Sequence, residues 1–211
     1  MKRLLIVNPN TSAAVTRWFA EEARRVALDG IEILAINADS GLEALQTPED
    51  VLTAGRAVVR VIEAHARAGD LAGAVIGAFG DPGLTEARAL GATRVVGLGE
   101  MSIRSAAQGG HSFSIVTLGA AMRGLITSKV AALGFEAELA GVDVLPFSML
   151  DMIADREATR ASIVDAVRRC SGEAVLLGGA PFAGMAWRMA RLTGKLVLDG
   201  VAACVSAIIA D

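Results

Sequence analysis

Two turns of this sequence have the form of ligand-binding turns but carry small residues at their leading positions. The first, GAFGDPGL at 77–84, follows the apolar stretch LAGAVI, and the second, GGAPFAGM at 178–185, follows AVLL. Glycine-rich turns after buried strands let the backbone approach a ligand closely. Ala78 and Gly179 lead the two turns and have no reactive group. The titratable and polar residues around them must therefore supply any chemistry.

Asp81 and Glu100 are the catalytic candidates among the carboxylates. Asp81 lies inside the first turn, where a cleft would perturb its pKa. The alternative is that Asp81 caps the following helix, with Pro82 at the first helical position. Glu100 follows Gly99 at a strand end and starts a helical stretch, where the helix dipole alone favours a carboxylate. Both interpretations stay open for each residue.

A polar turn follows the first apolar stretch, at Asn8, Asn10, Thr11 and Ser12. A helix N-terminus at this point would suit a substrate carboxylate or ureide oxygen. Thr11 or Ser12 could equally cap the helix, and the two roles are compatible. Thr117 stands at the equivalent strand end in the second half of the chain, as a second oxygen-binding candidate.

Composition excludes several classes of protein. The 211 residues carry 20 basic and 23 acidic side chains, a net charge of −3 that gives no footprint for nucleic acid. No apolar run reaches the ~18 residues of a membrane span, and the N-terminal MKRLLIV lacks the features of a signal peptide. Two cysteines and two histidines without ligand spacing predict no metal site and no disulfide framework. We expect a cytoplasmic, metal-free domain that has no membrane partner.

Short β-rich runs alternate with helical patterns along the whole chain, which predicts an α/β fold with mainly parallel sheets. The expected strands lie at 4–7, 31–36, 72–78, 94–98, 113–118, 142–147, 174–179 and 195–200. The expected helices lie at 11–28, 48–69, 83–90, 120–133, 155–170 and 183–193, with a further helical stretch at the C-terminus.

The two halves of the chain also resemble each other. A shift of about 101 positions superposes the two glycine turns and aligns Val95-Val96 with Leu196-Val197. We interpret this as a duplication that gives two pseudo-symmetric, three-layer Rossmann-like lobes, with residues 1–96 plus 198–211 in one and 97–197 in the other. Ligands of parallel sheets bind beyond the carboxyl ends of the strands. The two turns are therefore expected to face each other across one cleft.

The stretches IVNPNTS (6–12), GAFGDPGL, VVGLGE (95–100), FSIVTLG (113–119) and LDGVAA (198–203) are similar to the aspartate/glutamate/hydantoin racemase superfamily, and most of all to its hydantoin and allantoin racemases. The resemblance covers nearly the whole chain. It implies an enzyme without metal or organic cofactor that acts on small carboxylates or cyclic ureides. It also implies two catalytic cysteines on opposite faces of the substrate carbon, and a homo-oligomer.

This sequence departs from the family at those cysteines, which map to Ala78 and Gly179. Cys170 and Cys204 lie away from the turns and are predicted to be buried, inert thiols. A two-thiol mechanism is therefore not expected. The repeat partner of Asp81 is Phe182, so Asp81 could serve only one face of a substrate. The substrate-binding candidates are the residues of the polar turn, of the two glycine turns and of the second strand end: Asn8, Asn10, Thr11, Ser12, Ala78, Phe79, Gly80, Thr117, Gly179 and Ala180.

Three functional interpretations remain. The first is a racemase-type enzyme with non-cysteine acid/base groups, acting next to a carboxylate or in a cyclic amide. The second is a decarboxylase or lyase on the same fold, where one proton donor suffices. The third is a catalytically inactive protein that binds a small molecule. An engineered cysteine-free variant ranks below these, because Gly179-Ala180-Pro181-Phe182 does not look like a point substitution.

Overall fold

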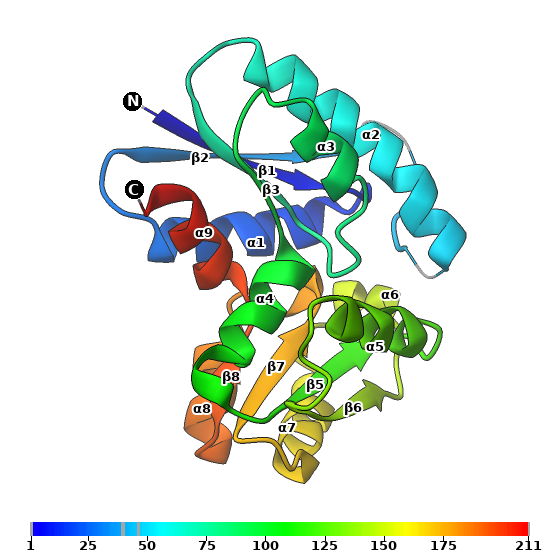
Figure 1. The fold of residues 1–211 in the computed structure, drawn as a ribbon. Helices are drawn as coiled ribbons and strands as arrows, with labels where there is room; N and C mark the ends of the chain where they lie inside the picture. The colour runs from blue at the N-terminus through cyan, green and yellow to red at the C-terminus, as the bar shows by residue number, and fades with distance from the viewer. Residues whose placement is uncertain (1, 39–40, 46, 211) are drawn as a thin grey trace.

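The computed structural model describes residues 2–38, 41–45 and 47–210, which form two lobes, each built on a four-stranded parallel sheet (Figure 1). The strand order is β2-β1-β3-β4 in the first sheet and β6-β5-β7-β8 in the second. The same order therefore occurs twice along the chain, and the predicted α/β fold of two parallel-sheet lobes is confirmed.

The elements of the first lobe run, in chain order, β1 (Lys2–Asn8), α1 (Ala13–Val26), β2 (Ile31–Asn37), α2 (Pro48–Ala66), β3 (Leu71–Ile76), α3 (Leu84–Ala89) and β4 (Val95–Gly97). Side-chain caps mark the starts of the two longest helices. The Ser12 side chain accepts a hydrogen bond from the Val15 amide at the start of α1. Thr47 and Asp50 form a capping box at the start of α2.

The remaining elements are α4 (Leu98–Ala106), η1 (Gln108–Gly110), β5 (Phe113–Leu118), α5 (Met122–Ala132), β6 (Leu139–Leu145), α6 (Met149–Ala154), α7 (Arg160–Arg169), β7 (Ala174–Gly178), η2 (Ala180–Phe182), α8 (Ala186–Thr193), β8 (Leu196–Leu198) and α9 (Val201–Ile209). Helix α9 returns to the first lobe, where Val201, Val205 and Ile208 join its core. The lobe boundaries at 96/97 and 197/198 stay a prediction.

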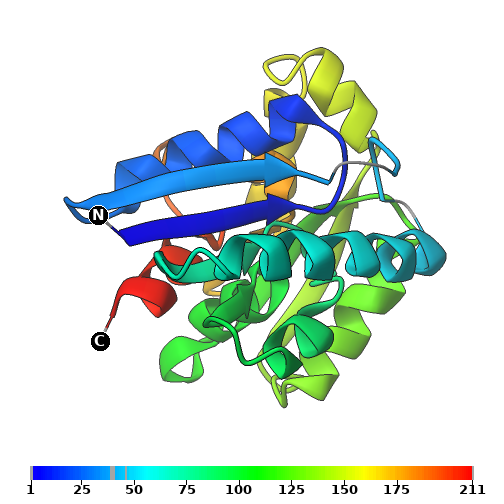
Figure 2. The same ribbon diagram turned by 90° about the horizontal axis from the view of Figure 1, so that it is seen from above.

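Helices cover both faces of each sheet, as Figure 2 shows for α1 and α2 on opposite sides of β1 and β2. Leu4 and Ile6 of β1 pack on the side of α1 and α9, whereas Leu5 and Val7 pack on the side of α2. Successive strand residues point to opposite faces, so a strand covered on both sides is apolar throughout. This explains the uninterrupted apolar runs of the sequence.

Each lobe contributes a residue of its glycine turn to the core of the other lobe. Phe79, which follows β3 of the first lobe, packs among second-lobe residues such as Ile115 and Ile126. Ala180, which follows β7 of the second lobe, packs in the first-lobe core with Val15 and Phe19. The two lobes are thus interlocked at the turns that the sequence repeat aligned.

The helix expected over 155–170 is wrong at its start. Helix α7 begins only at Arg160, and a separate helix, α6, precedes it at 149–154. The Asp155 carboxylate accepts hydrogen bonds from the amides of Glu157 and Ala158. Such a side-chain-to-backbone turn competes with the helix, so residues 155–159 form a break between α6 and α7.

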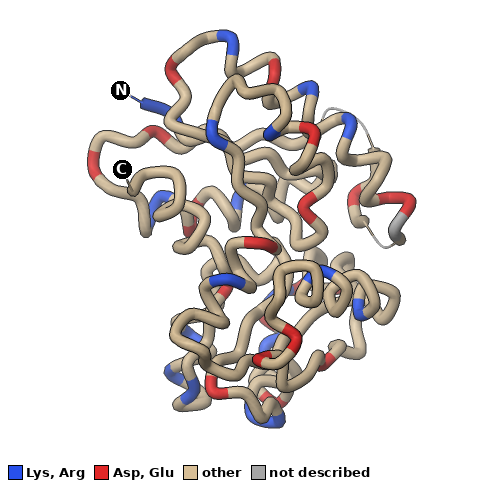
Figure 3. Tube along the Cα trace, viewed as in Figure 1, with Lys and Arg blue, Asp and Glu red and all other residues tan. Residues whose placement is uncertain are grey.

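Charged residues of both signs are spread over the two lobes (Figure 3). No helix of the described residues is long and apolar enough to cross a membrane. Over the same residues, no group of three or more His, Cys, Asp or Glu side chains is placed to hold a metal ion.

Candidate active site

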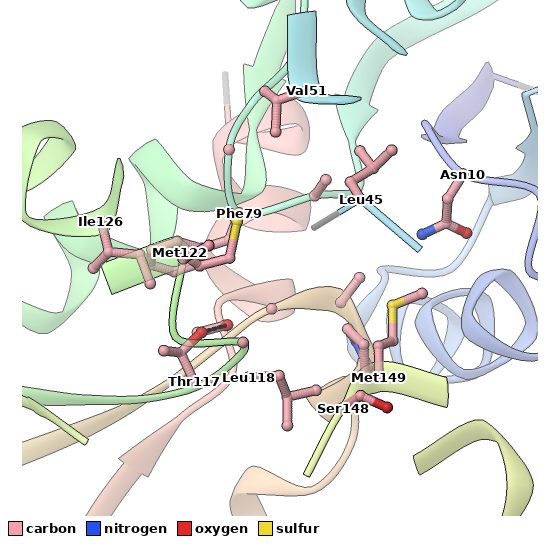
Figure 4. Close-up of a pocket in the computed structure, with 18 of the residues that line it drawn as sticks. Asn10, Leu45, Val51, Phe79, Thr117, Leu118, Met122, Ile126, Ser148 and Met149 are labelled. Carbon is pink, nitrogen blue, oxygen red and sulfur yellow. Dashed lines mark hydrogen bonds between the residues drawn. The ribbon is translucent and has the colours of Figure 1, made fainter. Parts of the chain in front are cut away.

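A cavity of about 260 Å³ lies between the lobes, at the carboxyl ends of strands from both sheets. Figure 4 shows Asn10 at one end of this cavity and Phe79, Met122 and Ile126 at the opposite end. The lining residues are Asn10, Leu45, Val51, Gly77, Ala78, Phe79, Gly80, Thr117, Leu118, Gly119, Ala120, Ala121, Met122, Ile126, Ser148, Met149, Gly178, Gly179, Ala180 and Pro181. The two glycine turns therefore share one cavity, as the sequence repeat predicted.

Ala78 and Gly179, which were expected from the sequence resemblance to stand at the two cysteine positions, both line the cavity. Gly179 has φ 151° and ψ 151°, a backbone conformation that is essentially restricted to glycine. A cysteine at 179 would thus be strained in this backbone. The second glycine turn differs from the first, because the short helix η2 begins directly after Gly179.

In the polar turn after β1, some side chains hold the turn together and one faces the cavity. The buried side-chain amide of Asn8 donates through Nδ2 to Asn10 Oδ1 at 2.8 Å and to Thr16 Oγ1 at 2.9 Å. The amide of Ser12 donates to Asn10 Oδ1 at 2.9 Å, so this oxygen is fixed. Asn10 is the residue of the turn that lines the cavity. Its Nδ2 group has no acceptor in the described part of the chain, which leaves it available to a ligand oxygen.

The other members of the polar turn do not line the cavity. Asn8 is enclosed by its neighbours, and Ser12 caps α1. Thr11 is exposed, and its amide donates to the Leu42 carbonyl at 3.1 Å. A direct contact of these three residues with substrate stays a prediction.

The equivalent turn of the second lobe is mainly apolar. Thr117 lines the cavity, but its hydroxyl already donates to the Gly178 carbonyl at 3.0 Å. Leu118 and Ala120–Met122 supply the neighbouring wall. The cavity is therefore polar on the side of Asn10 and apolar on the side of the second lobe.

The backbone of the glycine turns adds hydrogen-bond donors to this cavity. The amides of Ala78, Phe79, Gly80 and Ala180 make no hydrogen bond to another backbone group within the described residues. Because all four residues line the cavity, their N–H groups can serve a ligand oxygen that lies between the turns.

Asp81 is buried behind the first turn and is not a lining residue. Its carboxylate accepts hydrogen bonds from the amides of Gly99 and Glu100, each at 2.8 Å, and from Lys129 Nζ at 2.6 Å. Burial raises the pKa of the Asp81 carboxyl, while Lys129 and the two amides act in the opposite direction. Asp81 thus joins the first turn to α4 and to α5.

The expectation that Asp81 caps the helix directly after it is wrong. Helix α3 begins at Leu84 with Gly83 as its N-cap residue, and Asp81 has a left-handed φ of 51°. This conformation, which Asp tolerates better than most residues, directs the carboxylate to the N-terminus of α4 instead. The capping chemistry was predicted, but for the wrong helix.

Glu100 is likewise outside the cavity lining. Its carboxylate pairs with Arg88 at 2.9 Å and with Arg104 at 3.1 Å. The structure brings Glu100 next to Asp81 only through its backbone amide. A catalytic role for either carboxylate stays a prediction.

A second buried carboxylate, after the last strand of the second sheet, has a reciprocal arrangement. Asp199, which follows β8, accepts hydrogen bonds from the amides of Gly184 at 2.8 Å and Val201 at 3.2 Å. Burial raises its pKa, and the nearby Glu22 carboxylate acts in the same direction. At the first sheet the carboxylate comes from the glycine turn, and at the second it comes from the segment after the last strand. At each sheet a buried carboxylate thus ties these two segments together.

Both cysteines of the chain lie in core clusters and not in the cavity. Cys204 packs in the first-lobe core and Cys170 in the second. Burial raises the pKa of the Cys170 thiol, and it raises that of Cys204 well above its usual range. Neither thiol is a lining residue, so neither is placed to act on a ligand in this cavity.

The apolar residues that complete the cavity were not predicted from the sequence: Leu45, Val51, Leu118, Met122, Ile126 and Met149. Their spacing in the sequence does not indicate a common site, because they come from five segments that only the fold brings together. Ser148, whose hydroxyl is engaged with Asp151 in the cap of α6, was not predicted either. Among the described lining residues no side chain is Asp, Glu, His, Cys, Lys or Arg.

Comparison with known proteins places the chain in a family. Residues 4–208 match the Asp/Glu/Hydantoin racemase family. Proteins named hydantoin racemase are 30% identical in Paenarthrobacter aurescens and 29% identical in Pseudomonas sp. (strain NS671), each over 207 residues. These alignments cover 96% of this chain, and 88% and 83% of the respective relatives.

A solved structure agrees with the sequence relatives. The allantoin racemase from Klebsiella pneumoniae superposes with a TM-score of 0.91 and 28% identity, over 100% of this chain and 87% of that one. The chain belongs to the Asp/Glu/hydantoin racemase family.

Proposed function

We propose that this chain is a racemase-type enzyme that binds a small carboxylate or cyclic ureide between its lobes and acts at the carbon next to the carbonyl group. The observation that carries the proposal is that the cavity is lined by both repeated turns, at Ala78 and Gly179. This arrangement would present two opposite faces of one ligand carbon to the two lobes. The names of the relatives, hydantoin and allantoin racemase, support the same substrate class.

Ligand oxygens would be held by neutral donors. When a proton leaves the carbon, negative charge develops on the adjacent carbonyl oxygen, and preorganised donors stabilise it. The Asn10 amide and the free N–H groups of Ala78–Gly80 and Ala180 suit this role. The apolar wall of the second lobe would exclude water and strengthen these hydrogen bonds.

Proton transfer needs a separate group, and we propose that no thiol supplies it. The sequence resemblance assigns the family's cysteines to Ala78 and Gly179, which have no thiol, and Cys170 and Cys204 are buried elsewhere. Asp81, which directly follows Gly80 of the cavity wall, stays the acid/base candidate, and to act it would have to turn its carboxylate from the α4 amides toward the cavity. We further propose, from the family, that no cofactor takes part and that the chain is a cytoplasmic homo-oligomer.

A second candidate is a small-molecule-binding protein without turnover. It is favoured by the absence of any titratable side chain from the described cavity lining, since racemisation requires groups that remove and return a proton. In that case the donors of the turns would bind a ligand, and no bond to hydrogen would break.

Solvent exchange distinguishes the two candidates. The protein is incubated in D₂O with 5-substituted hydantoins, allantoin, amino acids and substituted malonates, and proton NMR follows deuterium incorporation at the carbon next to the carbonyl. The enzyme predicts incorporation, or CO₂ release from a malonate. Thermal stabilisation by a ligand without either reaction supports the binding protein and contradicts the enzyme.

Variants test the location and the proton donor. Ala78→Leu should fill the cavity and abolish exchange, whereas Ala64→Leu, on the exposed side of α2, should leave it unchanged. Asp81→Asn should slow exchange by at least ~10²-fold if Asp81 is the general base. Full activity of Ala78→Leu would show that the reaction occurs elsewhere.

A further inference from the structure

A second, smaller chamber of about 50 Å³ adjoins the end of the cavity that lies opposite Asn10. It shares five lining residues with the main cavity, namely Val51, Phe79, Gly80, Met122 and Ile126. Leu125 and Lys129 complete it. One water requires ~10–15 Å³ of such volume, so the chamber has room for a small polar group.

Lys129 is the one ionisable residue that lines either space in the described part of the chain. Its ammonium group carries three N–H donors, and within that part its single acceptor is Asp81 Oδ2, at 2.6 Å. The side chain of Asp81 is 1% exposed and that of Lys129 is 21% exposed. Asp81 therefore fixes the ammonium from behind, while two N–H donors remain for a group that enters the chamber.

The carboxylate of the nearby Glu100 is not bound to these donors. Glu100, whose amide also binds Asp81, directs its own carboxylate to Arg88 and Arg104. The other chamber residues are apolar or glycine. An anionic oxygen would thus meet an ammonium that is already paired with Asp81, and its gain would come from charge-assisted hydrogen bonds to the two remaining N–H donors.

We propose that Lys129 is a specificity-determining residue and that its chamber binds a carboxylate on the ligand's substituent. The ligand would have two polar ends, a carbonyl or ureide toward Asn10 and a carboxylate at Lys129. An apolar middle would lie along Phe79 and Met122. This inference rests on the proposed function, because it assumes that the ligand's reacting part occupies the main cavity.

The test compares two ligands that differ in one charge. Binding of hydantoin-5-acetate and of its neutral amide, hydantoin-5-acetamide, is measured by isothermal titration calorimetry. We expect the carboxylate to bind at least about tenfold more tightly to the wild type. Lys129→Met should remove this preference, and Lys129→Arg should retain part of it. Lys2→Met, at an exposed lysine, should leave the preference unchanged.

The outcomes separate this inference from the proposed function. If both ligands bind equally to the wild type, or if Lys129→Met keeps the preference, the Lys129 site is refuted while the cavity proposal stands. If neither ligand binds, both proposals fail for hydantoins. Lys129→Met leaves Asp81 without its cation, so the double variant Asp81→Asn/Lys129→Met serves as a second test. It should bind the neutral amide and show no preference for the carboxylate.

Discussion

Replacing Asp81 by alanine should destabilise the protein far more than an ordinary surface substitution. The carboxylate is buried and accepts hydrogen bonds from two α4 amides and from Lys129. Each buried donor left without an acceptor costs about 1–3 kcal/mol. The contribution of Lys129 is smaller than that of a fully buried partner, because its side chain is 21% exposed and can turn to water. We therefore expect Asp81→Ala to lower the free energy of unfolding by about 3–5 kcal/mol.

The left-handed backbone of Asp81 makes a second variant informative. Alanine at φ 51° retains steric strain of about 1–2 kcal/mol that glycine does not have. Asp81→Gly should therefore be about 1 kcal/mol more stable than Asp81→Ala. In the middle of a helix or strand the order is the opposite, because there glycine destabilises a protein relative to alanine. This reversed order tests the backbone conformation independently of the hydrogen bonds.

Urea unfolding followed by circular dichroism measures these differences. The variants should shift the midpoint without changing the denaturant slope. The control is Asp29→Ala, at an exposed carboxylate, which should stay within about 0.5 kcal/mol of the wild type. A loss below about 1 kcal/mol for Asp81→Ala would refute the role of Asp81 as a buried tie between the first turn, α4 and α5.

Two further predictions concern Gly179 and Asp199. Gly179→Ala should cost about 1–3 kcal/mol because φ is 151°, although its Cβ would meet no atom closer than Pro181 Cδ at 3.5 Å. The control Gly124→Ala, in α5 with open space around it, should be neutral or stabilising, and an equal loss in both variants would contradict the strain. For Asp199, burial raises the pKa of the folded carboxyl, so the folded state keeps its proton to a higher pH than the unfolded chain. From about pH 4 up to the folded pKa, wild-type stability should fall relative to Asp199→Asn, by at most about 1.4 kcal/mol per pH unit. Urea unfolding at several pH values checks this, with Asp29→Asn as the control, and a relative rise in wild-type stability would contradict it.

The fold was predictable because its signals are local and repeated. The apolar run of β1 and the capping residue Ser12 mark elements that the structure contains. The duplication then predicted that the turns at Ala78 and Gly179 share one cavity. The break at 155–159 was missed because the Asp155 turn competes with a helix that the periodicity favours.

The candidate site was predictable only in part. Asn10, Ala78 and Gly179 follow strands whose carboxyl ends meet, so topology alone placed them in one cavity. Asp81 was mislocated because its left-handed φ turns the carboxylate away from the next helix. Lys129 had no signal in the sequence, since its partner lies 48 positions away. Contacts between the lobes depend on packing that no local pattern encodes.

A structure of the protein with a bound 5-substituted hydantoin would show whether the two glycine turns form one substrate site. We expect the ring to lie between Ala78 and Gly179, with its C5 carbon facing both turns. A carbonyl oxygen should accept hydrogen bonds from Asn10 Nδ2 or from the amides of Ala78–Gly80. A ligand bound outside the residues that line the interlobe cavity, or one whose C5 carbon faces neither turn, would contradict the account.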